Sequence, residues 1–494
     1  MPKQRLYSST QIRSLEKRFA NVDPPMMERA GRAAANKAAS FLADSTEPVL
    51  VLAGPGNNGG DGLVLARCLR EAGREVCVVC VADPARLPPD AAAAHEAWRR
   101  AGGEILAAIP EAKWALVVDA IFGIGVSRAP TGIYADWIAW CANQPAPVLA
   151  LDVPSGLDAD TGRVLGAAVR AQHTLGFIAH KPGLFTLEGP EHAGEISLAD
   201  LDLPIPQEED AAVGELLAVE SLASVLRPRP RNSHKGSWGE VGILGGSAGM
   251  LGAVLLAARA ALMLGAGKVF AACLDPHAPG HDLVHPEIMF RPTQELAALA
   301  SVIAIGPGLG QGEAARALLA AVGDFDGALV CDADALNLLA QDAELAERLA
   351  RRAGDTVLTP HPAEAGRMLA CPTRDVQADR VGACRELARR FGAHVVLKGA
   401  GSVIADPDGA WAINPSGNAG LASAGTGDVL TGMVASLLAQ GWPADLALRG
   451  AVHLHGAAAD ALVASGEGPI GLTASEIAPM ARRLINRWVD AAGH

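Results

Sequence analysis

The sequence predicts an α/β protein of two domains, each built around a largely parallel β-sheet. Three observations support this fold class. The chain has 494 residues, more than one ordinary hydrophobic core accommodates. Short runs of Val, Ile and Leu alternate with Ala- and Leu-rich helical stretches, as expected for strands covered on both faces. The alternation occurs twice, on either side of a proline- and acid-rich stretch at 203–215.

The expected strands lie at regular intervals in both halves. They span 48–54, 75–83, 115–122 and 147–156 in the first half, and 239–247, 268–275, 301–310, 328–336, 356–364 and 394–406 in the second. The apolar stretch 249–269 is interrupted by Arg259 and is rich in Gly and Ala, so we predict a helix buried against a sheet rather than a membrane span. We place the domain boundary between residues 212 and 213, within the linker-like stretch.

Composition narrows the classes of partner. A net charge of −13 argues against nucleic acid, and 4% aromatic residues argue against a stacking platform for single strands. A local glycine loop can still bind a phosphorylated small molecule. The eight cysteines are scattered, and Cys77 and Cys80 lie in a strand-like run, so we expect buried thiols and a reducing, cytoplasmic location. The first 20 residues predict a charged surface helix rather than a signal peptide.

A glycine loop follows the first strand-like run of the amino-terminal half. Gly54, Gly56 and Gly59 satisfy G-x-G-x-x-G, the pattern of a dinucleotide-binding turn. The same loop contains Asn57, Asn58, Gly60 and Asp61. A carboxylate in the first helical turn would compete with a pyrophosphate for the same amides. Neutral amides beside an acid instead favour a site for hydroxyls, a carboxamide or a metal ion.

Two further strand ends carry polar loops. Asp119 precedes a glycine loop that contains Arg128, and Asp152 precedes a turn through Ser155. Ligands collect at the carboxyl ends of strands in an open parallel sheet, so the three loops should converge on one crevice. The alternative is that Asp119 and Asp152 only cap the turns or helices that follow them.

The motifs GPGNNGGDGLV, DAIFGIGVSR and DVPSGLDADTG, in this order over about the first 200 residues, resemble NAD(P)H-hydrate epimerase. The resemblance implies a Rossmann-like three-layer sandwich that interconverts the R and S forms of a hydrated nicotinamide cofactor. It implies that Asn58, Asp119 and Ser155 hold a potassium ion, and that Asp152 moves protons at the epimerising carbon. The residues implied to contact the hydrated cofactor are Asn57, Asn58, Gly59, Gly60, Asp61, Gly123, Ile124, Gly125, Val126, Ser127, Arg128, Ala129 and Asp152.

The stretch NAGLASAGTGDVLTG, from Asn418 to Gly432, predicts an anion site with an acid beside it. Small residues from Ala424 to Gly427 can turn successive backbone N–H groups toward a phosphate, and the apolar segment after them predicts a helix whose dipole adds to this site. Asp428 would then accept a proton from a hydroxyl that attacks phosphorus. The alternative role for Asp428 is a helix cap.

Four other loops in the carboxyl-terminal half follow strand-like runs, and their motifs are GGS, GPGLG, TPHPAE and LKGAGS. His361 lies between two prolines in TPHPAE, and Lys398 begins KGAGS. Taken singly, His361 could be a turn histidine with its hydrogen bonds satisfied and Lys398 a solvated lysine at a strand end.

Taken together with AGTGD, these loops resemble the ADP-dependent NAD(P)H-hydrate dehydratases, a ribokinase-like family, over residues 216–494. The resemblance implies ADP as phosphoryl donor, a magnesium ion and Asp428 as general base. It implies that the nucleotide contacts Lys398, Gly399, Ala400, Gly401, Ser402 and Gly427, and that the hydrated cofactor faces Ala253, Gly308, His361 and Asp428.

The sequence therefore predicts a bifunctional repair enzyme for hydrated NADH and NADPH, with residues 1–212 as the epimerase and 213–494 as the dehydratase. Its expected partners are these small molecules and ADP, with no nucleic acid or membrane, in a homo-oligomer. Two alternatives stay open. One is a hydroxymethylpyrimidine or sugar kinase fused to a ligand-sensing domain. The other is a non-catalytic amino-terminal domain that acts as a binding or scaffolding module.

Overall fold

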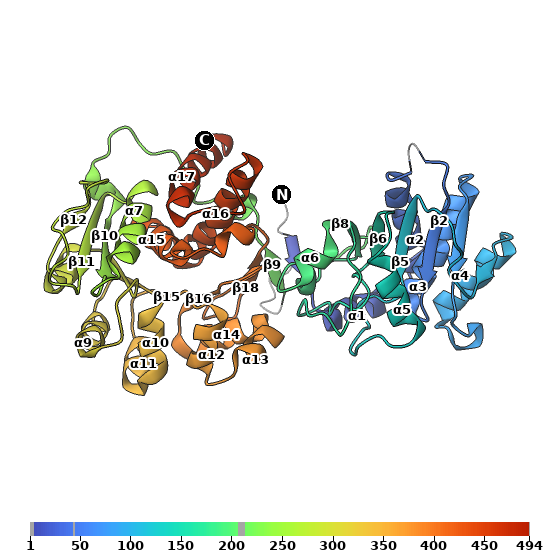
Figure 1. Cartoon of the computed structure of the whole chain (residues 1–494), viewed down its shortest axis with the longest axis horizontal. Helices are drawn as coiled ribbons and strands as arrows, with labels where there is room; N and C mark the ends of the chain where they lie inside the picture. Colours follow the sequence, from blue (N-terminus) through green and yellow to red (C-terminus); the bar gives the residue numbers. More distant parts are fainter. Residues whose placement is uncertain (1–3, 43–44, 206–212, 494) are drawn as a thin grey trace. The chain divides into compact units, whose positions relative to one another are not determined.

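The computed structural model describes residues 4–42, 45–205 and 213–493. They form two compact units, of which one spans Arg5–Val213 and the other contains Gln4 and the residues from Gly214 onward. The boundary predicted at 212/213 adjoins residues 206–212, which lie outside the described residues, as does most of the predicted linker. Both units are α/β, so the predicted fold class is confirmed (Figure 1).

The amino-terminal unit has one parallel sheet with the order β4-β3-β2-β5-β6-β7-β8. Its strands are β2 (Val49–Ala53), β3 (Val76–Val79), β4 (Ile105–Leu106), β5 (Leu116–Ala120), β6 (Val148–Leu151), β7 (His173–Phe177) and β8 (Glu195–Ala199). Counted from β2, the order is 3-2-1-4-5-6-7, which is the 3-2-1-4-5-6 order of a Rossmann-like sheet with β8 added at one edge. The order reverses between β2 and β5, which is where such folds bind their ligands.

Helices cover both faces of this sheet. They are α1 (Ser9–Arg18), α2 (Met26–Ala39), α3 (Asn57–Glu71), α4 (Pro89–Arg100), α5 (Ile133–Cys141) and α6 (Gly189–Ala193), and β1 (Gln4–Leu6) precedes them. One core cluster joins the sheet to α2 and α3, and a second joins its other face to α5. Every residue of β2, β5, β6 and β7 is buried, which explains why β2 and β6 read as continuous apolar runs.

The second sheet contains, in spatial order, β9-β18-β17-β16-β15-β14-β13-β10-β11-β12. The bounds are β9 (Gly214–Leu216), β10 (Glu240–Gly245), β11 (Lys268–Cys273), β12 (Met289–Phe290), β13 (Val302–Ile305), β14 (Ala328–Cys331), β15 (Thr356–Leu358), β16 (His394–Leu397), β17 (Ser402–Ala405) and β18 (Trp411–Asn414). The strands from β10 to β16 pair in parallel, whereas β17 runs antiparallel to both of its neighbours. The expected run 394–406 is therefore a hairpin whose turn is the KGAG segment.

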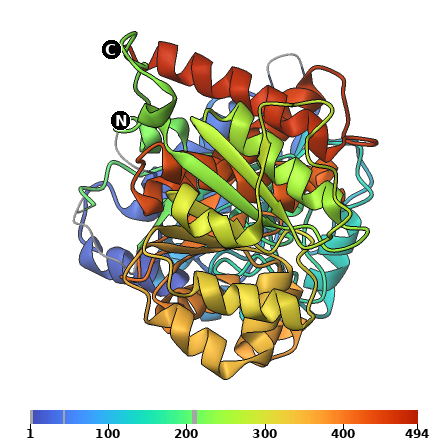
Figure 2. The ribbon, with the colours of Figure 1, turned by 90° about the vertical axis from the view of Figure 1, so that its left-hand side faces the viewer.

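Helices also cover both faces of the second sheet, as Figure 2 shows. On one face lie α7 (Leu251–Met263), α15 (Thr426–Ala439), α16 (Ala444–Ala464) and α17 (Ala474–Ala491). The remaining helices are α8 (Leu296–Leu299), α9 (Glu313–Val322), α10 (Asp334–Gln341), α11 (Ala343–Ala350), α12 (Pro362–Leu369), α13 (Thr373–Ala378) and α14 (Arg380–Phe391). The apolar stretch around Arg259 is α7, which packs in the core as predicted. Among the described helices, none is long and apolar enough to cross a membrane.

Candidate active sites

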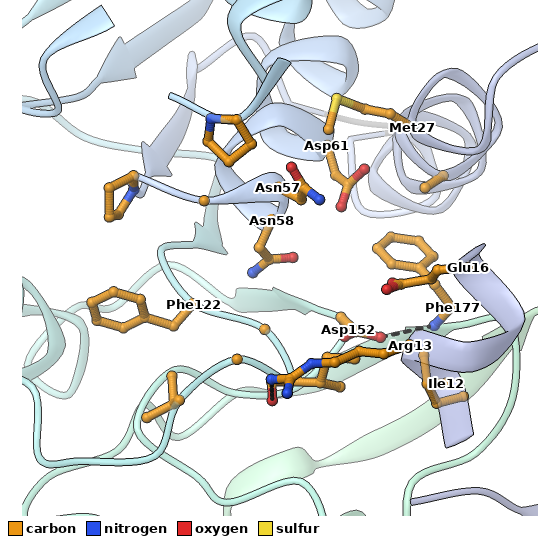
Figure 3. Close-up of a pocket in the computed structure, with 18 of the residues that line it drawn as sticks. Ile12, Arg13, Glu16, Met27, Asn57, Asn58, Asp61, Phe122, Asp152 and Phe177 are labelled. Atoms are coloured by element: carbon orange, nitrogen blue, oxygen red, sulfur yellow. Dashed lines mark hydrogen bonds between the residues drawn. The ribbon is translucent and has the colours of Figure 1, made fainter. Parts of the chain in front are cut away.

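The amino-terminal unit contains a cavity of about 1260 Å³ at the strand-order reversal. Three loops that follow β2, β5 and β6 converge there, as the sequence predicts (Figure 3). Its walls include these predicted residues: Asn57, Asn58, Asp61, Gly123, Ile124, Gly125, Val126, Ser127, Arg128, Ala129 and Asp152. A cavity of this size, lined by both apolar and polar groups, can hold a large nucleotide-like ligand.

Two predicted contacts, Gly59 and Gly60, are buried and do not line this cavity. A Cβ on Gly59 would lie 2.1 Å from the carbonyl oxygen of Gly54, and one on Gly60 would lie 2.6 Å from the Met27 side chain. These two glycines let α3 pack closely against its surroundings. They shape the loop that presents Asn57, Asn58 and Asp61.

Asp152 is held in place by a lysine that the sequence analysis missed. Lys181, fully buried, donates a hydrogen bond from Nζ to Asp152 Oδ1 and a second, of 2.6 Å, to the carbonyl oxygen of Phe177. The Phe177 amide donates to the same Asp152 oxygen at 3.2 Å. Asp152 has φ of +67°, a strained conformation for a residue with a side chain. The only signal for Lys181 was a lysine inside an otherwise apolar strand end, TLGFIAHKPG.

Of the other acids that line the same cavity, two have raised pKa values. Burial, and then the nearby Asp152 charge, raise the pKa of Asp61 well above its ordinary value. Burial and Asp152 also raise the pKa of Glu16, which α1 brings to the wall opposite Asp61 (Figure 3). The sequence predicted α1 only as a charged surface helix. In the structure, Ile12 and Leu15 of α1 are buried, and Arg13 and Glu16 line the cavity.

Of the residues predicted to hold potassium, Asn58 lines the cavity, whereas Asp119 and Ser155 are fully buried and do not line it. Asp119 is fully buried and accepts hydrogen bonds from the Ser155 hydroxyl at 2.5 Å and the Ser155 amide at 2.8 Å. Burial raises the Asp119 pKa to about 6 despite these bonds. Both side-chain polar atoms of Asn58 are buried without a hydrogen-bond partner among the described residues. A Cβ on Gly123 would lie 3.5 Å from Asn58 and 3.2 Å from Asp152, so the loop after β5 passes closely over both.

The carboxyl-terminal unit contains a cavity of about 410 Å³ at the ends of β14, β15 and β16. Of the predicted site residues, His361, Lys398, Gly399, Gly427 and Asp428 line it. Asp332 and Glu364 line it as well, and the sequence analysis singled out neither.

The helix predicted after the glycine-rich loop is present. Helix α15 begins at Thr426, and Gly425, at its amino-terminal cap, has φ of +88°, a conformation that favours glycine. Asp428 lies in the first turn of α15, so its carboxyl and the free amides of the helix start share one cavity. Burial and the charge of Asp332 raise the Asp428 pKa to about 6, although Lys398 opposes them. The sequence located the acid, but only the packing explains its raised pKa.

Lys398 is not a solvated strand-end lysine, because its ammonium pairs with Asp332 at 2.8 Å inside the cavity. Burial alone would lower the Lys398 pKa, but Asp332, Glu364 and Asp428 outweigh burial and raise it. A Cβ on Gly427 would lie 3.3 Å from Lys398 Nζ, so the ammonium lies against the start of α15. The site therefore presents a fixed positive charge beside the amides of the helix start.

His361 caps a helix and also lines the cavity. Its Nδ1 accepts hydrogen bonds from the amides of Ala363 at 3.1 Å and Glu364 at 3.3 Å, so it caps α12. Glu364 closes the capping box by accepting from the His361 amide at 2.8 Å. The ring still lines the cavity, and burial and Lys398 lower its pKa. The ring is therefore neutral near pH 7.

The KGAGS segment is the turn between β16 and β17, and a buried arginine supports it. Arg380 donates to the carbonyl oxygens of Leu397 at 3.2 Å, Lys398 at 3.4 Å and Gly401 at 3.4 Å. Gly399 and Gly401 have positive φ values of 142° and 60°. Ser402 donates to the Gly399 carbonyl at 3.1 Å. Of this segment, Ala400, Gly401 and Ser402 do not line the cavity of about 410 Å³.

Two further predicted residues, Ala253 and Gly308, lie together outside this cavity. A Cβ on Gly308 would lie 3.4 Å from the Cβ of Ala253 and 2.7 Å from that of Met250. They belong to the start of α7 and the loop after β13, which flank the reversal of strand order between β10 and β13.

Both halves match known protein families. A model described as YjeF-related protein N-terminus matches residues 24–183, and one described as NAD(P)H-hydrate dehydratase matches residues 241–481. A crystal structure of ADP/ATP-dependent NAD(P)H-hydrate dehydratase from Bacillus subtilis, co-crystallised with ATP and Mg²⁺, is 32% identical. The match covers 55% of this chain and 98% of that one, with a TM-score of 0.49.

Relatives match across both units. The bifunctional NAD(P)H-hydrate repair enzyme of Escherichia coli is 39% identical over 95% of this chain and 91% of its own length. That of Coxiella burnetii is 38% identical over 97% of this chain and 99% of its own length. The resemblance seen in the motifs is thereby confirmed over nearly the whole sequence. The chain belongs to the family of bifunctional NAD(P)H-hydrate repair enzymes.

Proposed function

We propose that the larger cavity epimerises the R and S hydrates of NADH and NADPH, and that the smaller one dehydrates the S form at the expense of ADP, releasing AMP and phosphate. The two activities complement each other, since dehydration of one form alone would leave the other unrepaired. The observation that best supports the dehydratase is Asp428, an acid with a raised pKa at the helix start where glycine amides can receive a phosphate.

A kinase-like site suits a dehydratase because hydroxide leaves poorly from a saturated carbon. Asp428 takes the proton of the substrate hydroxyl as its oxygen attacks the β-phosphorus of ADP, and the bond from that phosphorus to the bridging oxygen breaks to release AMP. The ring nitrogen then supplies the electron pair that expels phosphate. Loss of a proton from the adjacent carbon restores the double bond of NADH or NADPH.

The other side chains of the site position these groups. The amides of Gly425 to Gly427 stabilise charge on the transferred phosphoryl oxygens. The adenine nucleotide contacts the turn from Lys398 to Ser402 together with Gly427. The hydrated cofactor faces His361 and Asp428, and extends toward Ala253 and Gly308. His361 Nδ1 is occupied as the cap of α12, so Nε2, which lies 3.3 Å from Glu364 Oε1, is the ring atom left to contact the substrate.

Magnesium would accompany the nucleotide in this cavity. Among the described residues, no group of three or more His, Cys, Asp or Glu side chains is arranged to hold a metal ion. Magnesium commonly binds one or two carboxylates plus phosphate oxygens and water, so a pre-formed cage of protein ligands is not required. When bound, the ion supplies positive charge to the phosphates.

In the amino-terminal cavity, Asp152 moves the protons of epimerisation. Its Oδ1 accepts hydrogen bonds from Lys181 Nζ and from the Phe177 amide, which hold the carboxyl group at the cavity wall. The strained backbone at residue 152 directs this carboxylate to the cavity wall. The residues from Asn57 to Asp61 and from Gly123 to Ala129 form the pocket for the rest of the hydrated cofactor.

The oxygen-rich group of Asn58, Asp119 and Ser155 fits a potassium ion. The unpartnered Asn58 oxygen needs a partner, and the buried Asp119 carboxylate needs a counter-charge. When bound, the ion would supply that positive charge. Two of the three residues are already joined, because Ser155 donates two hydrogen bonds to Asp119.

Incubation of the protein with purified R and S hydrates and ADP tests the proposal, with each epimer followed separately by chromatography. We expect the S form to disappear only with ADP and to yield AMP, phosphate and reduced cofactor. The R hydrate should then disappear as well, at a rate higher than that of spontaneous epimerisation. Phosphorylation of a pyrimidine or sugar acceptor in place of the hydrate would support the kinase alternative. A homo-oligomeric state and a cytoplasmic location stay predictions, which light scattering and fractionation test.

A further inference from the structure

Asp332 lines the carboxyl-terminal cavity and has no role in the site as proposed so far. It follows β14 directly, and only 2% of its surface is exposed. Its Oδ1 accepts a hydrogen bond from Lys398 Nζ at 2.8 Å, and its Oδ2 accepts one from the Thr431 hydroxyl at 2.9 Å. A buried carboxylate that receives an ammonium and hydroxyl groups stays ionised, and these partners hold the Asp332 pKa below its ordinary value despite burial.

Lys398 is therefore placed between two carboxylates that compete for it. Its ammonium lies against Gly427, one residue before Asp428, and the charge of Asp428 acts on it. The hydrogen bond from Lys398, however, goes to Asp332. Thr431, one turn after Asp428 on α15, anchors Asp332 from the other side.

We propose that Asp332 is a positioning residue for phosphoryl transfer, which holds the Lys398 ammonium away from Asp428 and so leaves Asp428 able to accept the substrate proton. A general base that is already paired with an ammonium must break that pair before it takes a proton, and the pairing lowers its basicity. Asp332 takes the place of Asp428 as the ion-pair partner of Lys398. The Lys398 ammonium still lies beside the phosphate-binding amides. This role rests on the proposed function of Asp428.

The other titratable groups around Asp428 do not substitute for Asp332. Glu364 and His361 are occupied by the capping box of α12. His455, buried on α16, is hydrogen-bonded through Nε2 to the carbonyl oxygen of Thr426, and burial lowers its pKa to about 4, so it carries no charge near neutral pH.

The test is the pH dependence of kcat for ADP-dependent dehydration of the S hydrate, in the full chain with Asp332→Asn. Loss of the carboxylate removes its repulsion of Asp428 and releases Lys398 to pair with Asp428. We expect the acid limb of the profile to move down by about one pH unit or more, with kcat at its plateau reduced about tenfold. A merely structural loss would lower kcat and leave the acid limb in place, and that result would overturn the proposal.

Two further variants make the test decisive. Thr431→Val removes a hydrogen bond to Asp332 but no charge, so its acid limb should coincide with that of the unmodified chain; an equal shift there would also overturn the proposal. Asp332→Ser removes the same charge and replaces Asp332→Asn if the latter does not fold. If the unmodified chain shows no ADP-dependent dehydration, the proposed function itself fails. If it turns over and only the shift is missing, this inference alone fails.

Discussion

The sharpest prediction concerns Asp428→Asn. The substitution keeps the shape of the side chain at the start of α15 but removes its ability to accept a proton. A positioned general base contributes about 10²- to 10⁴-fold to rate, so we expect kcat for dehydration to fall by that factor while ADP still binds. For the unmodified chain, the pKa of about 6 predicts that kcat falls roughly tenfold per unit as pH drops below 6.

Asp428→Asn should lower activity but raise the free energy of unfolding. The folded-state pKa of Asp428 lies about two units above its ordinary value, because burial and Asp332 disfavour the ionised form. The folded state therefore binds more protons than the unfolded state between pH 4 and pH 6, and the Asp428 contribution to stability declines as pH rises through that window. Two units correspond to at most about 3 kcal/mol, and solvent in the cavity reduces this figure. Asp428→Asn should thus be more stable than the unmodified chain at pH 7 and equal to it near pH 4.

The assay combines recovery of reduced-cofactor absorbance from the purified S hydrate with calorimetric titration of ADP and denaturant unfolding at both pH values. Undiminished turnover in Asp428→Asn would refute the assignment of the base. Lost turnover together with lost ADP binding would show that the residue binds the nucleotide rather than the proton. Equal stability of the two proteins at pH 7 would refute the account of why the pKa is raised.

Three other predictions follow from particular contacts. Lys181→Met should abolish epimerisation of the R hydrate but leave dehydration of the S hydrate within about twofold, since it removes the cation beside Asp152; separate rates for the two epimers check this. Gly427→Ala should weaken ADP-dependent turnover about tenfold or more while epimerisation is unchanged, because its Cβ would lie 3.3 Å from Lys398 Nζ; undisturbed turnover would contradict the close approach. Replacement of potassium by a bulky organic cation should slow epimerisation alone, and Asn58→Ala should remove that dependence on the cation; epimerisation that is equally fast in both salts would argue against the ion.

Local signals in the sequence were enough to predict the architecture and the loops that bear the chemistry. Buried parallel strands read as apolar runs, and their carboxyl ends carry glycine loops, so the convergence of the loops after β2, β5 and β6 could be expected. The start of α15 was predictable because Gly425 and Thr426 impose their conformation within a few residues. The role of α1 in the cavity was missed because its buried face shows only Ile12 and Leu15.

The charge pairs that tune both sites were decided only by the tertiary structure. Lys181 meets Asp152 across 29 residues of sequence, and Lys398 meets Asp332 across 66. Hydrophobic periodicity reports which face of an element is buried, but it does not report which charged side chain meets which across the ends of neighbouring strands. Because these charged side chains are buried, their contacts shift pKa values, since the free-energy cost of a desolvated charge depends on every group around it. The sequence alone thus determined where the acids lie in the chain, and the packing of distant strands decided which of them hold a proton.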